Sequence, residues 1–453
     1  RASSMDALSP TSSSASMFDP QSARKFRKWR VAQRIVNSLG SEDLGIRAEA
    51  YDLDESETTP VRVLCMDGGG MRGYVTVVIL KRILEATGAW CVGEVFDLIV
   101  GTSTGGIIAL GAGLLRMTVA ELDSLYEQMA KDVFKPDSYV SLLTKGPGHV
   151  AAKSFENVLR NVLGDDPDEE MFSVGSHQRW FRSAVPAPRV VLVSSLVSRN
   201  PSSLYMHRSY RRENHSPSTV VDTSTSGKIK KKSELDYAGD YRIGMTAALR
   251  ATTAAPWYMA EHAVQKELGL GRATSDFESA APGKTGGEYD ETDSDGDGAG
   301  EREAEHTGHD DASRVTTKLR FVDGAIASNN PTAVGVFEAR RLFPRDRKLC
   351  VVSLGTGAAI PHEVPSTGYA QGQWVSNLIA ATCDVLQVDA TVRHVLGAGD
   401  RYFRFQPMGK TFGCELNDTK RETMEALRKE ATEYLDTEAA KAQVAELAAL
   451  LRK

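Results

Sequence analysis

The stretch that most constrains the fold is residues 96–106, FDLIVGTSTGG. Its first part, 96–100, is mostly apolar and predicts a buried strand, and an apolar helix is predicted over Ile107–Leu115. Between them lies GTSTG, residues 101–105. A strand, a tight glycine turn and a helix in immediate succession are the context that a G-x-S-x-G nucleophile elbow requires.

Such an elbow would hold a serine hydroxyl, that of Ser103, clear of the sheet and in front of a helix N-terminus. Because the turn is sharp, the residues two before and two after the serine must be small, and here they are Gly101 and Gly105. An ordinary Gly/Ser turn is the alternative, since a chain with 39 glycines can match this pattern by chance. Other motifs in the chain must therefore decide between a nucleophile elbow and an ordinary turn.

The length of 453 residues allows one large domain or two to three ordinary ones, and a hydrophobic content of 41% is enough for a sizeable core. The five cysteines are scattered and form no C-x-x-C pair, which argues against a disulfide framework or a zinc site and favours an intracellular compartment. No secretory signal peptide is visible at the start. Because the sequence begins with arginine, we expect a missing upstream segment that carries the targeting signal.

We expect an N-terminal segment, residues 1–58, that is Ser-rich, partly disordered, and basic over Arg24–Val36. The basic stretch has apolar side chains at helical spacing, so it can lie on an anionic membrane surface or dock on the domain through its apolar side. The uncharged run Leu98–Leu115 is long enough to cross a membrane, but its glycines and hydroxyl residues fit a strand and a helix around a turn better. We therefore expect no spanning helix.

The rest of the chain alternates apolar strands with helices, which predicts an α/β fold with a mainly parallel central sheet and helices on both faces. Buried parallel strands are continuous apolar runs, as these are. We expect one domain over 59–418 and a C-terminal helix in 419–453. Strands are predicted at residues 62–66, 96–100, 190–196, 319–322 and 349–354, and helices at 74–86, 107–115, 119–129, 331–343 and 419–451.

Two polar stretches interrupt this pattern: 211–236, with the basic cluster KIKKK at 228–232, and the acidic, glycine-rich 270–316. We interpret both as disordered surface loops inserted into one domain. The acidic insert contains D-x-D-x-D-G from Asp293, the opening of an EF-hand loop, but Ala304 takes the position of the bidentate glutamate. No calcium site is expected there.

The run Gly68-x-Gly70-x-x-Gly73 lies between the first predicted strand and the first predicted helix. It fits a dinucleotide-binding fingerprint. It also fits an oxyanion hole, because consecutive glycines leave backbone N–H groups open to a developing alkoxide. The elbow favours the second interpretation, since a nucleophilic serine some thirty residues downstream needs oxyanion donors and has no use for a nucleotide.

A serine nucleophile needs a base for its proton, most often a histidine held by a carboxylate. His362 or His394 would give the chain order of an α/β-hydrolase triad, but neither lies in a recognisable catalytic turn, and others, such as His207, lie in predicted loops. Asp323 ends an apolar strand and precedes Gly324, where an α/β sheet presents functional side chains. This aspartate can serve as the base directly, or it is only a turn residue or helix cap.

Together, DGGGMRG (67–73), GTSTG (101–105) and DGA (323–325) resemble the patatin-like phospholipases, close to their calcium-independent phospholipase A2 branch of the gamma type. The resemblance covers roughly residues 60–440 and breaks at the two inserts. Thr252 and Thr253 depart from it, since they replace serines. Further similar segments are LRATTAAPWYMAE (249–261), FVDGAIASNNPTAV (321–334), VVSLGTG (351–357) and YFRFQP (402–407).

The resemblance implies a three-layer α/β/α sandwich and calcium-independent hydrolysis of a fatty acyl ester of a glycerophospholipid through an acyl-serine intermediate. Ser103 would be the nucleophile and Asp323 its base, a dyad without histidine, and Arg72 would support the oxyanion loop. The oxyanion donors would be the backbone amides of Gly68, Gly69 and Gly70. No metal and no cofactor are implied.

The implied partner is a membrane phospholipid substrate, and the implied location is intracellular and peripheral to a membrane; no nucleic acid partner is expected, and organelle and oligomeric state stay open. A triacylglycerol lipase or a lipid acyltransferase would share every motif. A non-catalytic lipid-binding protein is suggested by the basic stretch and the KIKKK cluster. A nucleotide-binding protein is the alternative that the glycine fingerprint leaves.

Overall fold

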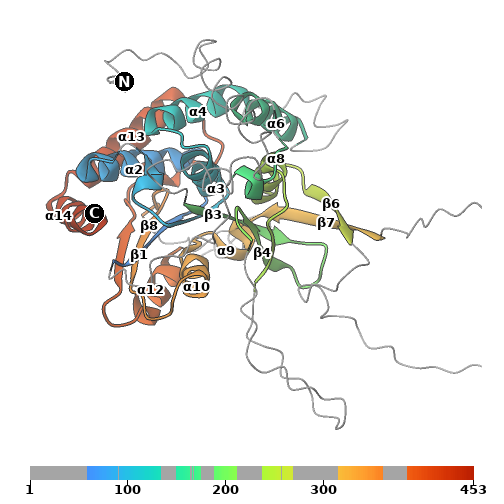
Figure 1. Ribbon diagram of the computed structural model, residues 1–453. Coiled ribbons are helices and arrows are strands. Elements are labelled where there is room, and N and C mark those ends of the chain that lie inside the picture. Colours follow the sequence, from blue (N-terminus) through green and yellow to red (C-terminus); the bar gives the residue numbers. More distant parts are fainter. Residues whose placement is uncertain are drawn as a thin grey trace, which may run out of the picture. The chain divides into compact units, whose positions relative to one another are not determined.

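The computed structural model of the chain (Figure 1) describes residues 59–89, 91–133, 149–163, 166, 168–174, 188–211, 237–256, 258–268, 315–360 and 385–452. The predicted N-terminal segment 1–58, with its basic stretch, lies outside the described residues. The KIKKK cluster, the EF-hand-like stretch and His362 also lie outside them.

The strands are β1 (Val61–Met66), β2 (Leu98–Thr102), β3 (Arg189–Leu196), β4 (Ser203–Arg208), β5 (Ala238–Asp240), β6 (His262–Leu268), β7 (Val315–Asp323), β8 (Leu349–Leu354) and β9 (Arg401–Phe405). The α-helices are α2 (Gly73–Thr87), α3 (Thr104–Ala109), α4 (Val119–Asp132), α6 (His149–Leu163), α8 (Met245–Thr252), α9 (Ala325–Ser328), α10 (Thr332–Leu342), α12 (Leu386–Val395), α13 (Arg421–Leu435) and α14 (Glu438–Leu451). The shorter helical turns are η1 (Gly70–Arg72), η2 (Val92–Glu94), the π-helical η3 (Leu110–Leu114) and η4 (Thr411–Gly413).

The central sheet has the strand order β5-β4-β3-β2-β1-β8-β9. From β3 to β9 all neighbours run parallel. The exceptions lie at β3, where β4 pairs antiparallel and the last residues of β7 also pair antiparallel. The predicted α/β fold with a mainly parallel sheet is therefore confirmed, with antiparallel strands added next to β3.

Helices cover both faces of this sheet, which gives the three layers implied by the resemblance (Figure 1). On one face lie α2 and α3, and α13 and α14 pack on α2; on the other lie α10 and α12. Val63 and Cys65 of β1 lie against α10, where they approach Gly335. Because both faces are covered, all six residues of β1 are buried, which explains its continuous apolar sequence.

Residues 264–319 form a unit of their own. Its described part consists of most of β6 and the beginning of β7, and these strands pair with each other. The acidic insert predicted at 270–316 falls within this unit. The predicted end of the insert is too late, because Val315 already begins β7.

The single helix predicted over 419–451 is wrong, since α13 ends at Leu435 and α14 begins at Glu438. Asp436 and Thr437 separate them, and the side-chain oxygen of Thr437 accepts a hydrogen bond from the N–H of Ala440 at 3.3 Å and so caps a new helix. Good helix formers on both sides of this residue hide the break from a periodicity argument.

Strands β4, β5, β6 and β9 were not predicted. Their sequences carry charged or polar residues, as in RYFRF of β9, so they lack the continuous apolar run typical of the inner strands. His207 lies in β4 and not in the predicted loop.

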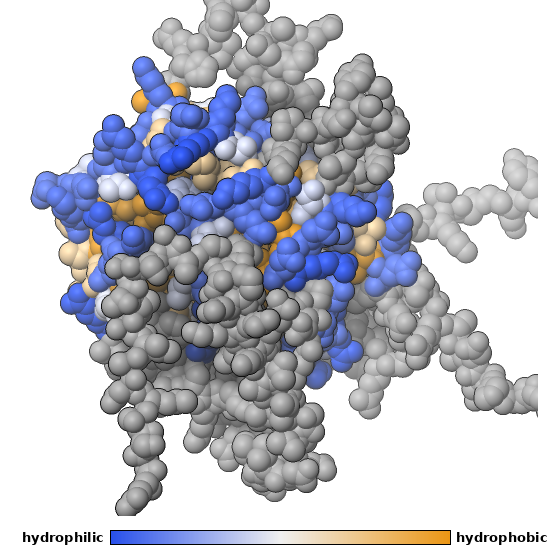
Figure 2. Space-filling view, turned by 90° about the horizontal axis from the view of Figure 1, so that it is seen from above, coloured by the Kyte–Doolittle hydropathy of each residue, from blue (hydrophilic) through white to orange (hydrophobic). Residues whose placement is uncertain are grey.

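Within the described part of the chain, no helix is both long and apolar enough to cross a bilayer. The uncharged run Leu98–Leu115 divides into β2, α3 and the turn η3. The described surface in Figure 2 is mainly hydrophilic with smaller hydrophobic areas. The exposed large hydrophobic side chains of the described residues are Tyr237, Ile360, Leu386, Val395 and Met408.

Candidate active site

Ser103 lies between β2 and α3 with φ 54° and ψ −119°. This backbone conformation is strained for a residue that carries a Cβ. The strand ends at Thr102 and the helix begins at Thr104, so the chain reverses at the serine itself. The strand, turn and helix predicted from GTSTG are therefore present, with Ser103 at the tip.

The two glycines of the elbow are required by close packing. A Cβ on Gly101 would lie 2.2 Å from the carbonyl oxygen of Gly105. A Cβ on Gly105 would lie 2.3 Å from the carbonyl oxygen of Met66, at the end of β1. Backbone atoms cannot yield at such distances, so both positions admit only glycine if the turn is to keep its shape.

Two strands that share one edge of β3 bring Ser103 and Asp323 together. β2 pairs with residues 189–193 of β3, and β7 pairs with residues 194–196. β4 occupies the opposite edge of β3 over 191–196. β7 therefore pairs with the same edge of β3 as β2 does, directly beyond the point where the pairing with β2 ends. The ends of β2 and β7 therefore meet head to head, although they are more than two hundred residues apart in sequence.

The hydroxyl of Ser103 donates a hydrogen bond to Oδ2 of Asp323 at 2.6 Å. The other carboxylate oxygen, Oδ1, accepts the backbone N–H of Ala325 at 2.8 Å. The backbone of Asp323 is fixed as well, since its carbonyl accepts the Ser195 hydroxyl at 2.9 Å and its N–H donates to Ala254 at 2.9 Å. Both oxygens of the carboxylate thus have defined directions, and one faces the serine.

Asp323 is almost completely buried, with 3% of its surface exposed. Loss of hydration raises the pKa of its carboxyl from the ordinary 3.8 to about 6, against the opposing effect of the hydrogen bonds from Ser103 and Ala325. Within the described residues, no lysine, arginine or histidine forms an ion pair with this carboxylate. A base with a pKa near neutrality is better matched to a serine hydroxyl than an ordinary aspartate.

Neither His207 nor His394 hydrogen-bonds to this pair. His207 is buried in β4, where its Nε2 lies 3.0 Å from the hydroxyl of Ser194 and its ring packs on Tyr205 and Phe321. His394 lies on the exposed side of α12, with Nδ1 2.8 Å from the carbonyl of Ala390. The arrangement of the described residues is therefore that of a serine and a carboxylate in direct contact.

The predicted oxyanion loop lies beside the serine. A Cβ on Gly68 would be 3.3 Å from the Cβ of Ser103. The N–H of Gly68 already donates to the carbonyl of Asn329 at 3.1 Å, so this amide is engaged in the structure. In the part of the chain that the structure describes, the amides of Gly69 and Gly70 donate no hydrogen bond. Of the three predicted oxyanion donors, Gly69 and Gly70 therefore keep N–H groups without an acceptor among the described residues.

Arg72 and Gly73 follow this loop. The guanidinium of Arg72 donates to the carbonyl of Phe412 at 2.6 Å and so ties the end of the loop to η4. A Cβ on Gly73 would lie 2.2 Å from the side-chain oxygens of Thr104 and Tyr126. The third glycine of the fingerprint is thus explained by packing of α2 against the elbow helix.

Thr252, at the end of α8, connects the two members of the pair. Its hydroxyl accepts the strained backbone N–H of Ser103 at 2.9 Å and donates to the carbonyl of Val193 at 2.5 Å. Its own carbonyl accepts the N–H of Gly324 at 3.2 Å. Neighbouring Thr253 has a different role, because its hydroxyl returns to the carbonyl of Leu249 within the helix at 2.7 Å.

Thr252→Val is expected to slow the reaction of Ser103 with a fluorophosphonate probe by roughly 10- to 100-fold, because the elbow loses the acceptor that holds it. Thr252→Ser restores the hydroxyl and is expected to stay within about threefold of the wild type. Thr253→Val is the matched control, since it removes a buried hydroxyl of the same kind away from the elbow. Equal labelling rates for both valine variants would contradict this assignment.

Some residues around the site were not predicted as site residues. In the sequence, Thr252 stands out only as a departure from a serine, and Asn329 only as part of the segment 321–334. The sequence does hold a signal for Thr252, because serine and threonine both carry a hydroxyl that can accept the backbone N–H of Ser103.

Among the described residues, no group of three or more His, Cys, Asp or Glu side chains lies close enough together to hold a metal ion.

The family model described as patatin-like phospholipase matches residues 64–336. Phospholipase A I of Arabidopsis thaliana is 27% identical over 396 residues, which cover 79% of this chain and 25% of that protein. Calcium-independent phospholipase A2-gamma is 27% identical over 382 residues in Rattus norvegicus and 26% over 385 in Homo sapiens. In both cases 83% of this chain and 38% of the relative are covered.

The chain therefore spans about 25% to 38% of the length of these relatives. The family match covers more than half of the chain and includes the glycine loop, Ser103 and Asp323. The resemblance predicted from DGGGMRG, GTSTG and DGA is confirmed, and the chain belongs to the patatin-like phospholipase family.

Proposed function

We propose that this protein is a lipid acyl hydrolase that cleaves a fatty acyl ester of a glycerophospholipid, with Ser103 as nucleophile and Asp323 as base. The observation that carries the proposal is the 2.6 Å hydrogen bond from the Ser103 hydroxyl to the buried Asp323 carboxylate at the elbow. The similarity to proteins named phospholipase A I and calcium-independent phospholipase A2-gamma supports a phospholipid substrate.

In the first half-reaction, ionised Asp323 accepts the proton of Ser103 while the serine oxygen attacks the ester carbonyl. The carbonyl oxygen becomes an oxyanion, which the amides of Gly69 and Gly70 stabilise. The tetrahedral intermediate then expels the lysophospholipid alkoxide, and this leaving group takes the proton from Asp323. The product is an acyl-serine.

In the second half-reaction, Asp323 accepts a proton from water, which attacks the acyl-serine. The second tetrahedral intermediate releases the fatty acid, and the proton returns to the oxygen of Ser103. One aspartate thus serves as base and acid in both halves. A pKa of about 6 suits both duties, because the carboxyl is ionised at neutral pH yet a stronger base than an ordinary aspartate.

The test is fatty acid release from phosphatidylcholine vesicles in excess chelator, with separate analysis of fatty acid and lysophospholipid. Equimolar release of the two products without added calcium is expected, in line with relatives named calcium-independent. A substrate panel with triacylglycerol and an alcohol acceptor separates the phospholipase from a triacylglycerol lipase and an acyltransferase. Folded protein that releases no fatty acid from any of these lipids would overturn the proposal.

The pH profile is expected to report Asp323. Because the ionised form is the base, kcat/KM rises about tenfold per pH unit below the pKa and levels off above it. With the carboxyl pKa raised to about 6, half of the maximum is expected near pH 6. The measurement is hydrolysis of a soluble, uncharged ester between pH 4.5 and about 8, which avoids titration of the lipid. A profile that stays flat over this range would contradict the assignment of the base.

A further inference from the structure

The glycine loop begins at a buried ion pair. Asp67, the residue directly before Gly68, pairs through both carboxylate oxygens with the guanidinium of Arg404 on β9, at 3.0 Å and 2.5 Å. The side chains of Arg404 and Asp67 are 5% and 1% exposed. Two parallel hydrogen bonds from a rigid guanidinium fix both the position and the plane of the carboxylate.

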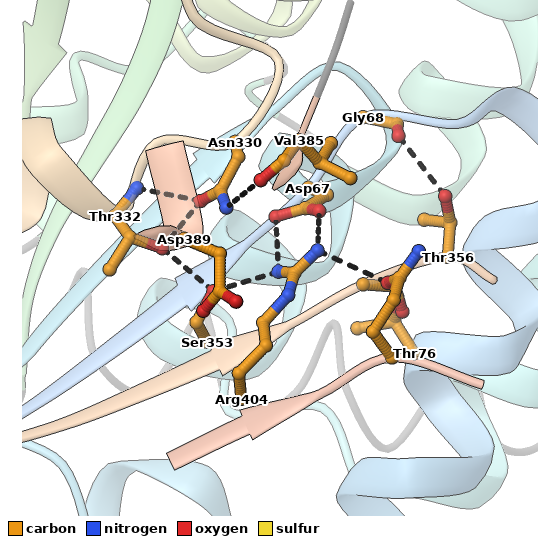
Figure 3. A network of polar contacts seen from close by, with 12 residues as sticks. Asp67, Gly68, Thr76, Asn330, Thr332, Ser353, Thr356, Val385, Asp389 and Arg404 are labelled. Carbon is orange, nitrogen blue, oxygen red and sulfur yellow. Dashed lines mark hydrogen bonds and ion pairs between the residues drawn. The ribbon is translucent and has the colours of Figure 1, made fainter. Parts of the chain in front are cut away.

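Arg404 is itself held by the neighbouring strands, as Figure 3 shows. It also donates to the hydroxyl of Ser353 on β8 at 2.8 Å and to the side-chain oxygen of Gln406 at 3.1 Å. The hydroxyl of Ser353 lies 2.7 Å from that of Thr332, the first residue of α10. The guanidinium therefore has several partners, and its place does not depend on the glycine loop alone.

The same C-terminal part of the chain also touches the loop directly. The hydroxyl of Thr356 donates to the carbonyl of Gly68 at 3.2 Å (Figure 3), and the carbonyl of Leu416 accepts the N–H of Met71 at 2.8 Å. Gly70, with φ 57°, approaches this carbonyl so closely that a Cβ would lie 2.3 Å from it. Arg404, Thr356 and Leu416 all lie beyond residue 336, where the family match ends.

We propose that Arg404 is a positioning residue for the oxyanion loop: through Asp67 it fixes the direction in which the amides of Gly69 and Gly70 point. Consecutive glycines have more backbone freedom than any other residues, so a loop of them keeps one conformation only if its ends are clamped. Oxyanion donors act in catalysis only when they are aligned before the charge develops. The inference rests on the proposed function.

The test compares Arg404→Lys with Arg208→Lys in the full chain. Arg208 is a matched control, because it is buried and pairs in the same way with Glu338, at 2.7 Å and 3.4 Å, but contacts neither the loop nor Ser103. Lysine keeps the charge and loses the two-pronged contact in both variants. Both are expected to lose thermal stability to a similar extent.

Only Arg404→Lys is expected to lose activity, with kcat about 100-fold lower and KM within about twofold of the wild type, since oxyanion donors act on the transition state. Its labelling by a fluorophosphonate is expected to slow by a similar factor. Arg208→Lys is expected to keep both rates within about threefold. Equal kcat values for the two variants, measured below their melting temperatures, would overturn the positioning role and leave the proposed function intact.

A double variant, Asp67→Asn with Arg404→Gln, covers the case in which Arg404→Lys does not fold, because it leaves no unpaired buried charge. It is expected to fold and to show the same loss of kcat. Wild-type kcat in this folded double variant would overturn the positioning role. Absence of both hydrolysis and labelling in the wild type would instead overturn the proposed function, and the positioning role with it.

Discussion

Ser103→Ala is expected to lower kcat for fatty acid release by about 10⁵-fold or more, because the reaction loses the atom that attacks the ester. The fold is expected to survive, since only the hydroxyl is removed and its one hydrogen-bond partner among the described residues is Oδ2 of Asp323. The measurement is hydrolysis of phosphatidylcholine vesicles by wild type and variant at equal protein concentration, with thermal melts as the check on folding.

Ser194→Ala is the matched control for this substitution. Ser194 is a buried serine on β3 whose hydroxyl contacts His207 and not the Asp323 carboxylate. Its loss is expected to change kcat by less than about tenfold. If the Ser103 variant kept wild-type kcat while folded, another group would be the nucleophile and the proposed mechanism would be wrong.

Asp323→Asn is expected to lower kcat by about 10⁴-fold and, at the same time, to make the protein more stable at neutral pH. Asparagine can still accept the N–H of Ala325 but cannot take a proton from Ser103. The gain in stability follows from burial, because the raised pKa of about 6 means that the folded state resists ionisation of this carboxyl.

The sign and range of this effect follow from the two pKa values. Since the folded pKa lies above the ordinary 3.8, the folded state binds the proton more tightly, and the wild type loses stability as pH rises from about 4 to about 6. Above that range the cost of the buried charge is on the order of 3 kcal/mol, at 1.36 kcal/mol per pKa unit. Asparagine carries no charge and avoids this cost.

Thermal melts of wild type and Asp323→Asn at pH 4.5, 6 and about 8 test this prediction. The difference in melting temperature is expected to grow in favour of the variant as pH rises, while the other titrating groups cancel in the comparison. A variant that melts below the wild type at every pH would show that Asp323 stabilises the fold as a paired or hydrogen-bonded charge, which is the opposite of our account.

The elbow could be predicted because its requirements are local. An apolar strand, two glycines at fixed spacing and an apolar helix all lie within twenty residues around Ser103, and each is visible in the sequence. Asp323 was also predicted, but for an incomplete reason. It does not end a parallel strand of the sheet. It ends β7, which runs antiparallel to β3 and pairs with the same edge of β3 as β2, just beyond the end of β2.

That register depends on which strands pair, and no local pattern specifies it. The same limit applies to Arg404, which lies in the short, charged sequence RYFRF and gives no sign that its guanidinium will meet Asp67. It applies to Gly68 as well, where the glycine run predicts three open amides and the structure engages one of them with Asn329. Motifs that act within one turn were predictable, and contacts between distant segments were not.

The most direct test of the account is to react the full chain with a long-chain alkyl fluorophosphonate and to locate the adduct by peptide mass spectrometry. We expect a single adduct on Ser103, formed in proportion to the loss of phospholipid hydrolysis and much more slowly in Asp323→Asn. Hydrolysis that persists when Ser103 is fully modified, or an adduct on another residue that alone tracks the loss of activity, would contradict it.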